Sequence, residues 1–205
     1  MQVAINEAMG LTFSKALRSF LRQDPDIIMV GEVRDLDTAE NAVQASLTGH
    51  LVFSTLHTND APSSITRLLD LGLPAYLIAS TVVGIMAQRL LRKICKHCER
   101  SYQLLPEEAA AVGLASDLSK PIMVKYGEGC VQCRGTGYLG RTGIFEVLEV
   151  NEKIRPLITE KADSEFIKRT AIADGMVPLR EGAVRKMLAG ETTFDEVIRV
   201  TGEKV

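Results

Sequence analysis

The chain has 205 residues, of which 46% are hydrophobic and 24% charged, and its formal net charge is −2 at pH 7. This length and apolar content suffice for a buried core in one large domain or two smaller ones, and the near-neutral charge argues against a dedicated nucleic-acid binder. The longest apolar stretch, from Tyr76 to Ala87, is broken by Ser80, Thr81 and Gly84 and is shorter than the ~20 residues of a membrane span. We therefore expect a soluble, cytoplasmic protein.

The first part of the chain alternates between helix and strand patterns. Apolar residues at helical spacing predict an amphipathic helix over 11–23, which Pro25 ends. Continuous apolar runs at 27–30 and 51–55 predict strands buried on both faces of a parallel sheet. Between and after these strands we expect two helices, one starting at Asp37 and one running from 62 to 71. The alternation predicts an α/β fold over residues 1–94, with a parallel sheet and crossover helices.

The residue pattern of the sequence changes after Cys95. Residues 95–142 are rich in loops, with a short helix expected at 106–114, and we predict that they form a small separate module. The pattern of 143–150 predicts one strand, and the rest predicts helices, one of them started by Thr192 and Thr193 with Glu196 in a capping box. The predicted domains are therefore 1–94, 95–142 and 143–205.

Polar side chains follow both predicted parallel strands. Glu32 comes directly after the first strand, and Thr55 and His57 come at the end of the second. Ligands of open α/β sheets bind at the carboxyl ends of the strands, so these residue types favour a phosphate and Mg²⁺ site. The alternative is structural, with Glu32 a solvated acid paired with Arg34 and His57 a turn residue bonded to backbone.

A phosphate site of this class usually needs a glycine-rich loop that ends in Lys and Ser or Thr. The 205 residues contain no such loop, and the glycine-rich stretch GEGCVQCRGTG at 127–137 carries cysteines instead. Either the phosphate interpretation is wrong or the loop lies before Met1.

The only four cysteines form two CxxC knuckles, Cys95/Cys98 and Cys130/Cys133, about 30 residues apart. This spacing is typical of a structural Zn²⁺ site with four thiolate ligands. A disulfide pair is an alternative that a reducing compartment disfavours, and His97 is expected at the surface. A nucleic-acid-binding zinc ribbon is a further alternative, supported by basic residues that a helix end and a solvated rim explain as well: Arg92, Lys93, Lys96, Arg100 and Arg134.

Four segments together resemble the secretion-type AAA-like ATPases of type II secretion and type IV pilus assembly, the GspE/PilB type. GLTFSKALRSFLRQDPDIIMVGEVRD (10–35) resembles the family's helix and Walker B segment, and TGHLVFSTLHTNDAPSSITRL (48–68) resembles its His box. AQRLLRKIC (87–95) resembles the helix that follows, and the CxxC knuckles resemble its tetracysteine metal module.

The resemblance implies a partial RecA-like parallel sheet, a tetracysteine zinc module and a C-terminal helical subdomain. It implies a homohexamer that binds ATP with Mg²⁺ between subunits. By resemblance Glu32 is the Walker B acid and His57 senses the γ-phosphate, with Gly31 and Thr55 as nucleotide-binding neighbours. Arg18 and Arg22 resemble arginines that reach across the subunit interface, although an exposed helix face explains them equally.

The chain departs from the family pattern because it lacks the P-loop and the acidic box. We therefore expect the C-terminal part of a hexameric ATPase that powers type II protein secretion or type IV pilus assembly and is inactive alone. Its expected partners are inner-membrane secretion or pilus platform proteins that hold it at the membrane, and no nucleic acid. The alternative is a zinc-stabilised interaction or adaptor module that does not hydrolyse nucleotide.

Overall fold

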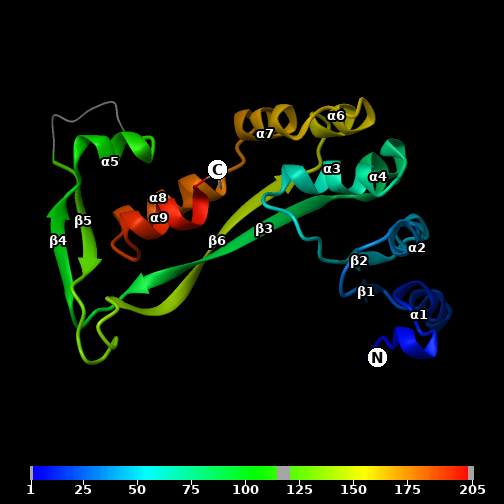
Figure 1. Ribbon diagram of the computed structural model, residues 1–205. Coiled ribbons are helices and arrows are strands. Elements are labelled where there is room, and N and C mark those ends of the chain that lie inside the picture. Colours follow the sequence, from blue (N-terminus) through cyan, green and yellow to red (C-terminus); the bar gives the residue numbers. More distant parts are fainter. Residues whose placement is uncertain (1, 115–120, 203–205) are drawn as a thin grey trace. The chain divides into compact units, whose positions relative to one another are not determined.

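The computed structural model describes residues 2–114 and 121–202, so Met1 lies outside the described part. Two compact units are present, the first comprising Met1–Ile85 with Leu148–Gly175 and the second Met86–Val147 with Met176–Val205. Their bounds differ from the three predicted segments, because the chain passes between units within β3 (Gly84–Ile94) and β6 (Tyr138–Glu149). Figure 1 labels the elements.

The first unit begins with the short helix η1 (Glu7–Met9) and the predicted amphipathic helix, α1 (Phe13–Phe20), which continues as η2 (Leu21–Gln23). The hydroxyl of Thr12 caps α1 by accepting a hydrogen bond from the Lys15 amide at 3.3 Å. Asp24 then takes a left-handed backbone conformation, φ 50°, immediately before Pro25, and the helix ends there.

The small parallel sheet of the first unit pairs β1 (Ile27–Met29) with β2 (Leu51–Phe53). The crossover between them is α2 (Leu36–Leu47), so the predicted strand–helix–strand order is confirmed. The N-cap of the helix lies two residues before the predicted Asp37, because the Asp35 side chain accepts the hydrogen bond from the Thr38 amide, at 2.8 Å.

The prediction that β1 is buried on both faces is wrong for the described residues. Ile28 is buried against Leu17 of α1 and Ala45 of α2, whereas Ile27 and Met29 are 61% and 71% exposed. Successive side chains of a strand point to opposite faces, and these helices cover only the face of Ile28. The opposite face stays apolar and exposed.

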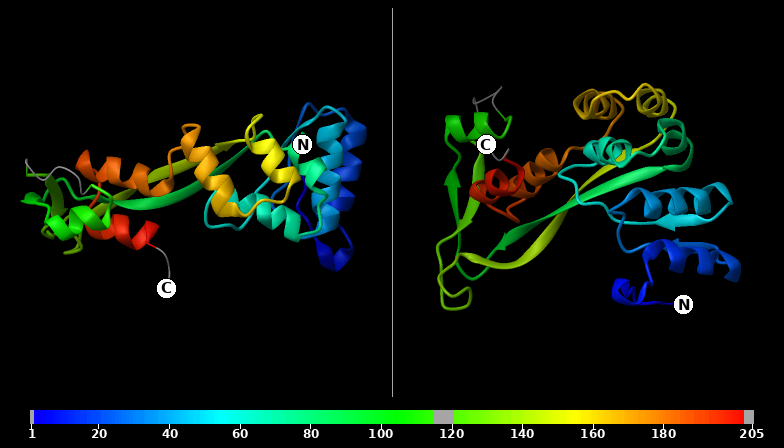
Figure 2. Two further views of the ribbon diagram at one scale, coloured as in Figure 1. Left: turned by 90° about the horizontal axis from the view of Figure 1, so that it is seen from above. Right: turned by 45° about the vertical axis from the view of Figure 1, so that its right-hand side comes forward.

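Four more helices complete the first unit. They are α3 (Pro62–Asp70), α4 (Ala75–Thr81), α6 (Ile154–Thr159) and α7 (Ser164–Ala173). Helix α3 packs against α7, and α4 packs against α6, as Figures 1 and 2 show. The packed helices are about 80 to 100 residues apart in the sequence, and each buries an isoleucine that has no exposed surface: Ile65, Ile78, Ile158 and Ile167.

The second unit contains most of the paired strands β3 and β6, together with the antiparallel pair β4 (Glu99–Gln103) and β5 (Met123–Gly127). Its helices are α5 (Pro106–Ala111), α8 (Leu179–Leu188) and α9 (Phe194–Thr201). Their core side chains include Leu91, Val124, Ile144, Met187 and Val197.

The helix that the resemblance implied at 87–95 is wrong, because residues 87–94 belong to β3. Ala, Gln, Arg and Leu are good helix formers, but intrinsic propensity is a weak prior that tertiary pairing overrides. Here pairing with β6 supplies the hydrogen bonds, and Leu91 and Ile94 are buried in the unit. The strand expected at 143–150 is confirmed within the longer β6.

Candidate functional site

The two parallel strands bring Glu32 and His57 together. The ladder continues past the strands, with the Val30 amide donating to the Phe53 carbonyl at 2.8 Å and the Val33 amide to the Thr55 carbonyl at 3.0 Å. Two adjacent loops therefore run side by side at the carboxyl end of the sheet. Across them His57 Nε2 lies 2.8 Å from Glu32 Oε1.

Gly31 and Thr55 join the same two loops. The Thr55 hydroxyl donates a 2.6 Å hydrogen bond to the Gly31 carbonyl. This bond joins the two loops next to Glu32 and His57. A Cβ on Gly31 would lie 3.3 Å from the ring of Phe13, so α1 packs tightly under this loop. The four predicted residues of the two loops thus form one local cluster.

Glu32 also pairs with Arg34, whose Nη2 lies 2.7 Å from Oε2. The hydrogen bond from Arg34 lowers the pKa of the Glu32 carboxyl below its ordinary value; burial acts in the opposite direction, and the charges of Arg34 and His57 add to the lowering. The acid is therefore ionised at neutral pH, as a cation ligand must be. The predicted alternative partner, Arg34, and the predicted catalytic partner, His57, contact the same carboxylate at once.

The turn that carries His57 is held by contacts that the sequence pattern did not reveal. The Thr58 hydroxyl lies 2.7 Å from that of Ser64 in α3, and Asp60 Oδ1 accepts a 3.0 Å hydrogen bond from the Ser63 amide. Asp60 Oδ2 also faces Lys168 of α7 at 3.5 Å. Because 108 residues separate that ion pair, no local signal could have identified it.

Arg18 and Arg22 lie on the exposed side of α1 and its continuation η2. Arg18 lines a surface depression with Asp37, Glu40 and Asn41 of α2, and Arg22 Nη2 donates to the Ser19 hydroxyl at 3.4 Å. Both guanidinium groups are thus available at the surface of the first unit.

The four cysteines converge in the second unit, and their Sγ atoms all lie within 4.8 Å of one another. The distances are 3.8 Å for Cys95–Cys130, 3.8 Å for Cys98–Cys133 and 3.7 Å for Cys130–Cys133. A disulfide needs about 2.05 Å, whereas tetrahedral Zn–S bonds of about 2.3 Å put sulfur atoms about 3.8 Å apart. The four free thiols therefore have the spacing of a tetrahedral metal centre.

Burial and hydrogen bonds shift the pKa values of two of the cysteines in opposite directions. Burial raises the pKa of Cys98, to about 12, and the neighbouring thiols contribute. Burial acts likewise on Cys133, but hydrogen bonds from the Cys130 and Gly137 amides outweigh it and lower the pKa to about 6. The Cys133 thiol therefore loses its proton more readily than the Cys98 thiol.

The glycine-rich stretch around the second knuckle has a packing role. A Cβ on Gly127 would lie 2.0 Å from the Gly137 carbonyl oxygen, so the two backbones meet with no room for a side chain. The Gly129 amide donates to Cys98 Sγ at 3.3 Å, and the Gly137 amide donates to Cys133 Sγ at the same distance. These glycines bring backbone donors to the sulfur atoms.

Basic residues near the knuckles mostly face carboxylates. Lys96 pairs with Glu99 at 3.0 Å, Arg100 with Glu128 at 3.2 Å and Arg92 with Glu196 at 2.8 Å. His97 is exposed. Three of the five basic residues that supported a nucleic-acid interpretation are thus neutralised by acids of the same chain.

The profile of the family described as "Type II/IV secretion system protein" matches residues 1–199. This chain belongs to that family. The chain is 45% identical to the type IV pilus assembly ATPase TfpB of Acinetobacter baylyi, over 97% of this chain and 34% of that protein. It is 45% identical to type II secretion system protein E of Pseudomonas aeruginosa (99% and 40%) and 46% identical to the pilus assembly ATPase PilB of Thermus thermophilus (98% and 23%).

Solved structures give the same picture of the fold. The pilus retraction motor PilT with bound ADP superimposes with a TM-score of 0.64 at 29% identity, covering 94% of this chain and 44% of that one. The Legionella pneumophila ATPase DotB, at 23% identity, matches with a TM-score of 0.61 over 92% and 42%. The chain thus spans roughly a quarter to two fifths of the sequence relatives named above, and the predicted α/β class and family resemblance are confirmed.

Within the described ranges, each helix is too short or too polar to cross a membrane.

Proposed function

We propose that this chain is the part of a secretion or pilus-assembly ATPase that carries the Walker B acid, Glu32, and the γ-phosphate-sensing histidine, His57. The 2.8 Å contact between them at the carboxyl end of two parallel strands supports this most directly. Loops converge at that edge of an α/β sheet, which is where ligands bind. Membership of the secretion family, whose relatives named above include pilus assembly ATPases, supports ATP hydrolysis as the reaction class.

The chemistry of the donors fits magnesium and a nucleotide. Mg²⁺ takes oxygen ligands and keeps several waters, and when bound it offsets charge on the phosphates. Glu32 presents an ionised carboxylate to the ion or its waters, and His57, largely exposed, can turn toward a phosphate. For Glu32 to do so, the contact with His57 or that with Arg34 must loosen, so nucleotide binding changes the partners of the acid.

The proposed assembly is a homohexamer with ATP between subunits, held on the cytoplasmic side of the inner membrane by secretion or pilus platform proteins. The exposed guanidinium groups of Arg18 and Arg22 on one side of the first unit support a role at a subunit boundary. Arginines in such positions stabilise charge on a transferring phosphate.

The proposal is tested by measuring phosphate release from Glu32→Gln and His57→Ala variants of the full-length protein, by which we mean a chain of the family's length that also carries the P-loop. Glu32→Gln keeps the shape but removes the charge, so ATP still binds while turnover falls by about 10²-fold or more. His57→Ala lowers turnover with less effect on binding. Glu152→Gln, an exposed acid of the first unit, serves as the matched control. Wild-type turnover in both site variants would instead favour a zinc-stabilised interaction module without hydrolysis.

We further propose that the four cysteines hold one structural Zn²⁺, because their spacing fills all four positions of a tetrahedral thiolate site. Purified, reduced protein then contains about one zinc per chain. Cys98→Ser or Cys130→Ser removes one ligand and should release the metal while the first unit stays folded. Metal-free wild-type protein, prepared without chelator, would overturn this assignment.

A further inference from the structure

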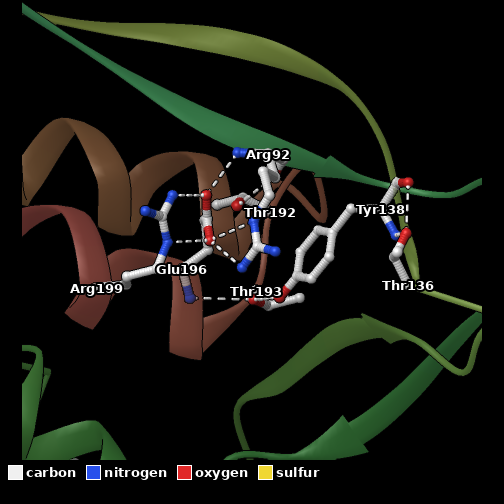
Figure 3. Close-up of polar contacts among 7 residues, drawn as sticks. All are labelled: Arg92, Thr136, Tyr138, Thr192, Thr193, Glu196 and Arg199. Atoms are coloured by element: carbon white, nitrogen blue, oxygen red, sulfur yellow. Dashed lines mark hydrogen bonds and ion pairs between the residues drawn. The ribbon is translucent and has the colours of Figure 1, made fainter.

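Glu196 is a fully buried acid that neither proposed site uses. It lies in the first turn of α9, has no exposed surface, and accepts hydrogen bonds from two arginines. Arg92 donates from its backbone amide at 2.8 Å, from Nε at 2.9 Å and from Nη2 at 2.8 Å. Arg199 donates from Nε at 2.8 Å and from Nη2. Figure 3 shows both guanidinium groups turned toward the carboxylate.

The segment that leads into α9 also binds the end of β3. The Thr192 hydroxyl donates to the Arg92 carbonyl at 2.8 Å, and the Ile94 amide donates to the Glu191 carbonyl at 2.9 Å. The residue after Ile94 is Cys95, the first thiol of the metal centre. The backbone that delivers the first knuckle is therefore fixed from one side by residues 191–196.

The same cluster reaches the strand that leaves the second knuckle. The Arg92 guanidinium lies 4.0 Å from the ring centroid of Tyr138, and the Tyr138 hydroxyl lies 2.7 Å from that of Thr193. Tyr138 directly follows Gly137, which accepts from the Cys95 amide at 2.9 Å and donates to Cys133 Sγ. One polar cluster thus contacts the chain on entry to the first knuckle and on exit from the second.

We propose that the cluster of Arg92, Tyr138, Thr192, Thr193, Glu196 and Arg199 positions the two CxxC knuckles, so that docking of α9 and retention of the metal are coupled. The inference rests on the proposed zinc centre. Its physical basis is that a metal held by four ligands from two segments binds tightly only while both segments keep their spacing. Outer contacts of this kind commonly change metal affinity by about 10- to 100-fold.

The exposure of the two arginines allows the coupling to be tested without unfolding the protein. A buried carboxylate that loses its cations is costly, whereas the cations here are 44% and 55% exposed and can be solvated when the acid is neutralised. Glu196→Gln therefore removes the charge and weakens the hydrogen bonds with Arg92, while the apolar core of the second unit remains. Tyr138→Phe removes a single hydroxyl and keeps the ring under the guanidinium.

The experiment measures the rate of zinc transfer from full-length protein to a chromophoric chelator, below the unfolding temperature. Glu196→Gln is expected to release zinc about tenfold faster or more, and Tyr138→Phe faster by a smaller factor. Glu181→Gln, which removes an exposed acid of α8 that pairs with Arg185, should match the wild type. Folded Glu196→Gln and Tyr138→Phe variants with wild-type release rates would overturn the inference.

Coupling is reciprocal, so removal of zinc must loosen α9 to the same extent that loss of the cluster loosens zinc. Hydrogen exchange of the full-length protein before and after chelation is expected to show faster exchange in 194–201, with α7 of the first unit unchanged. Unchanged exchange in α9 after complete zinc removal would contradict the coupling, even if Glu196→Gln fails to fold. Wild-type protein that binds no zinc would instead refute the proposed metal centre itself.

Discussion

At the residue scale, the acidity of Glu196 gives a signed prediction of stability against pH. Burial raises the pKa of its carboxyl, but hydrogen bonds from Arg199 and Arg92 outweigh burial and lower the pKa from 4.5 to about 2. A lowered folded-state pKa stabilises the protein at pH values above the unfolded value of 4.5 and loses that contribution as the pH falls toward 2. The contribution of Glu196 is therefore constant near neutrality and declines below about pH 4.5.

The measurement compares urea unfolding of the wild type and Glu196→Gln between pH 7 and pH 3. Because Glu196→Gln is also expected to retain zinc less well, both proteins are compared in the metal-free state, so that the difference between them reports the carboxylate alone. The difference in the free energy of unfolding between the wild type and Glu196→Gln is expected to be largest at neutral pH and to become steadily smaller in acid. A gap that stays constant or widens as the pH falls would show that the ion pairs with Arg92 and Arg199 do not stabilise the fold.

Single residues were predictable from sequence where a simple rule connects position to chemistry. Glu32 and His57 follow adjacent parallel strands, and the CxxC spacing identifies four thiols, so both clusters could be named in advance. Glu196 was recognised only as a helix-capping residue. Its amide does bond the Thr193 hydroxyl, at 3.2 Å, but its carboxylate binds an arginine 104 residues away, which no local pattern contains.

At the element scale, the close approach of two glycines fixes the end of β5 against the segment after Cys133. Gly127 has an ordinary backbone conformation, so Gly127→Ala is penalised only by the clash of its Cβ with the Gly137 carbonyl. Overpacking against backbone costs about 1–3 kcal/mol or more. We expect Gly127→Ala to lower the unfolding temperature of the second unit and to weaken zinc retention.

Gly182→Ala is the matched control for that change. Gly182 lies inside α8, and a Cβ there would meet its nearest atom at 3.9 Å, which is ordinary contact. Alanine is favoured over glycine in a helix by about 0.5–1 kcal/mol, so this variant should be as stable as the wild type or slightly more. Equal behaviour of the two alanine variants in a thermal melt would exclude the close backbone approach.

Helices α1, α2 and α3 and the two parallel strands of the first unit match the predicted segments, because the apolar periodicity that indicates them is local in the sequence. Residues 87–95 did not, because their helix-favouring composition competes with pairing to a strand about 50 residues away, which the sequence pattern does not display. The prediction that β1 is buried on both faces was wrong for a related reason. An apolar run shows that a strand can be buried on both faces, but whether both faces are covered depends on elements elsewhere in the chain. Long-range partners thus account for both errors.

At the scale of the whole molecule, the parallel sheet has only two strands in the described residues, and one face of it is apolar and open. Two-stranded sheets are marginal alone, so α1 and α2 stabilise this one through Leu17, Ile28 and Ala45. The sequence relatives named above are roughly two and a half to four times as long as the matched region. Glu32 and His57 thus follow the ends of a two-stranded sheet that two helices hold from one face.

This 205-residue chain, expressed by itself, is expected to hydrolyse ATP at no measurable rate and to bind it weakly. Most affinity in sites of this class comes from backbone amides of a glycine-rich loop, its lysine and its hydroxyl, and these residues contain no such loop. In the roles proposed for them, Glu32 and His57 act on a nucleotide that other groups already hold, so their contribution to affinity is expected to be small. Phosphate release and calorimetric titration with Mg²⁺ and ATP test this directly, with the full-length protein as the positive control. Robust turnover by the short chain that disappears in Glu32→Gln would mean that other residues of this chain hold the phosphates, and would contradict the division of roles proposed for Glu32 and His57.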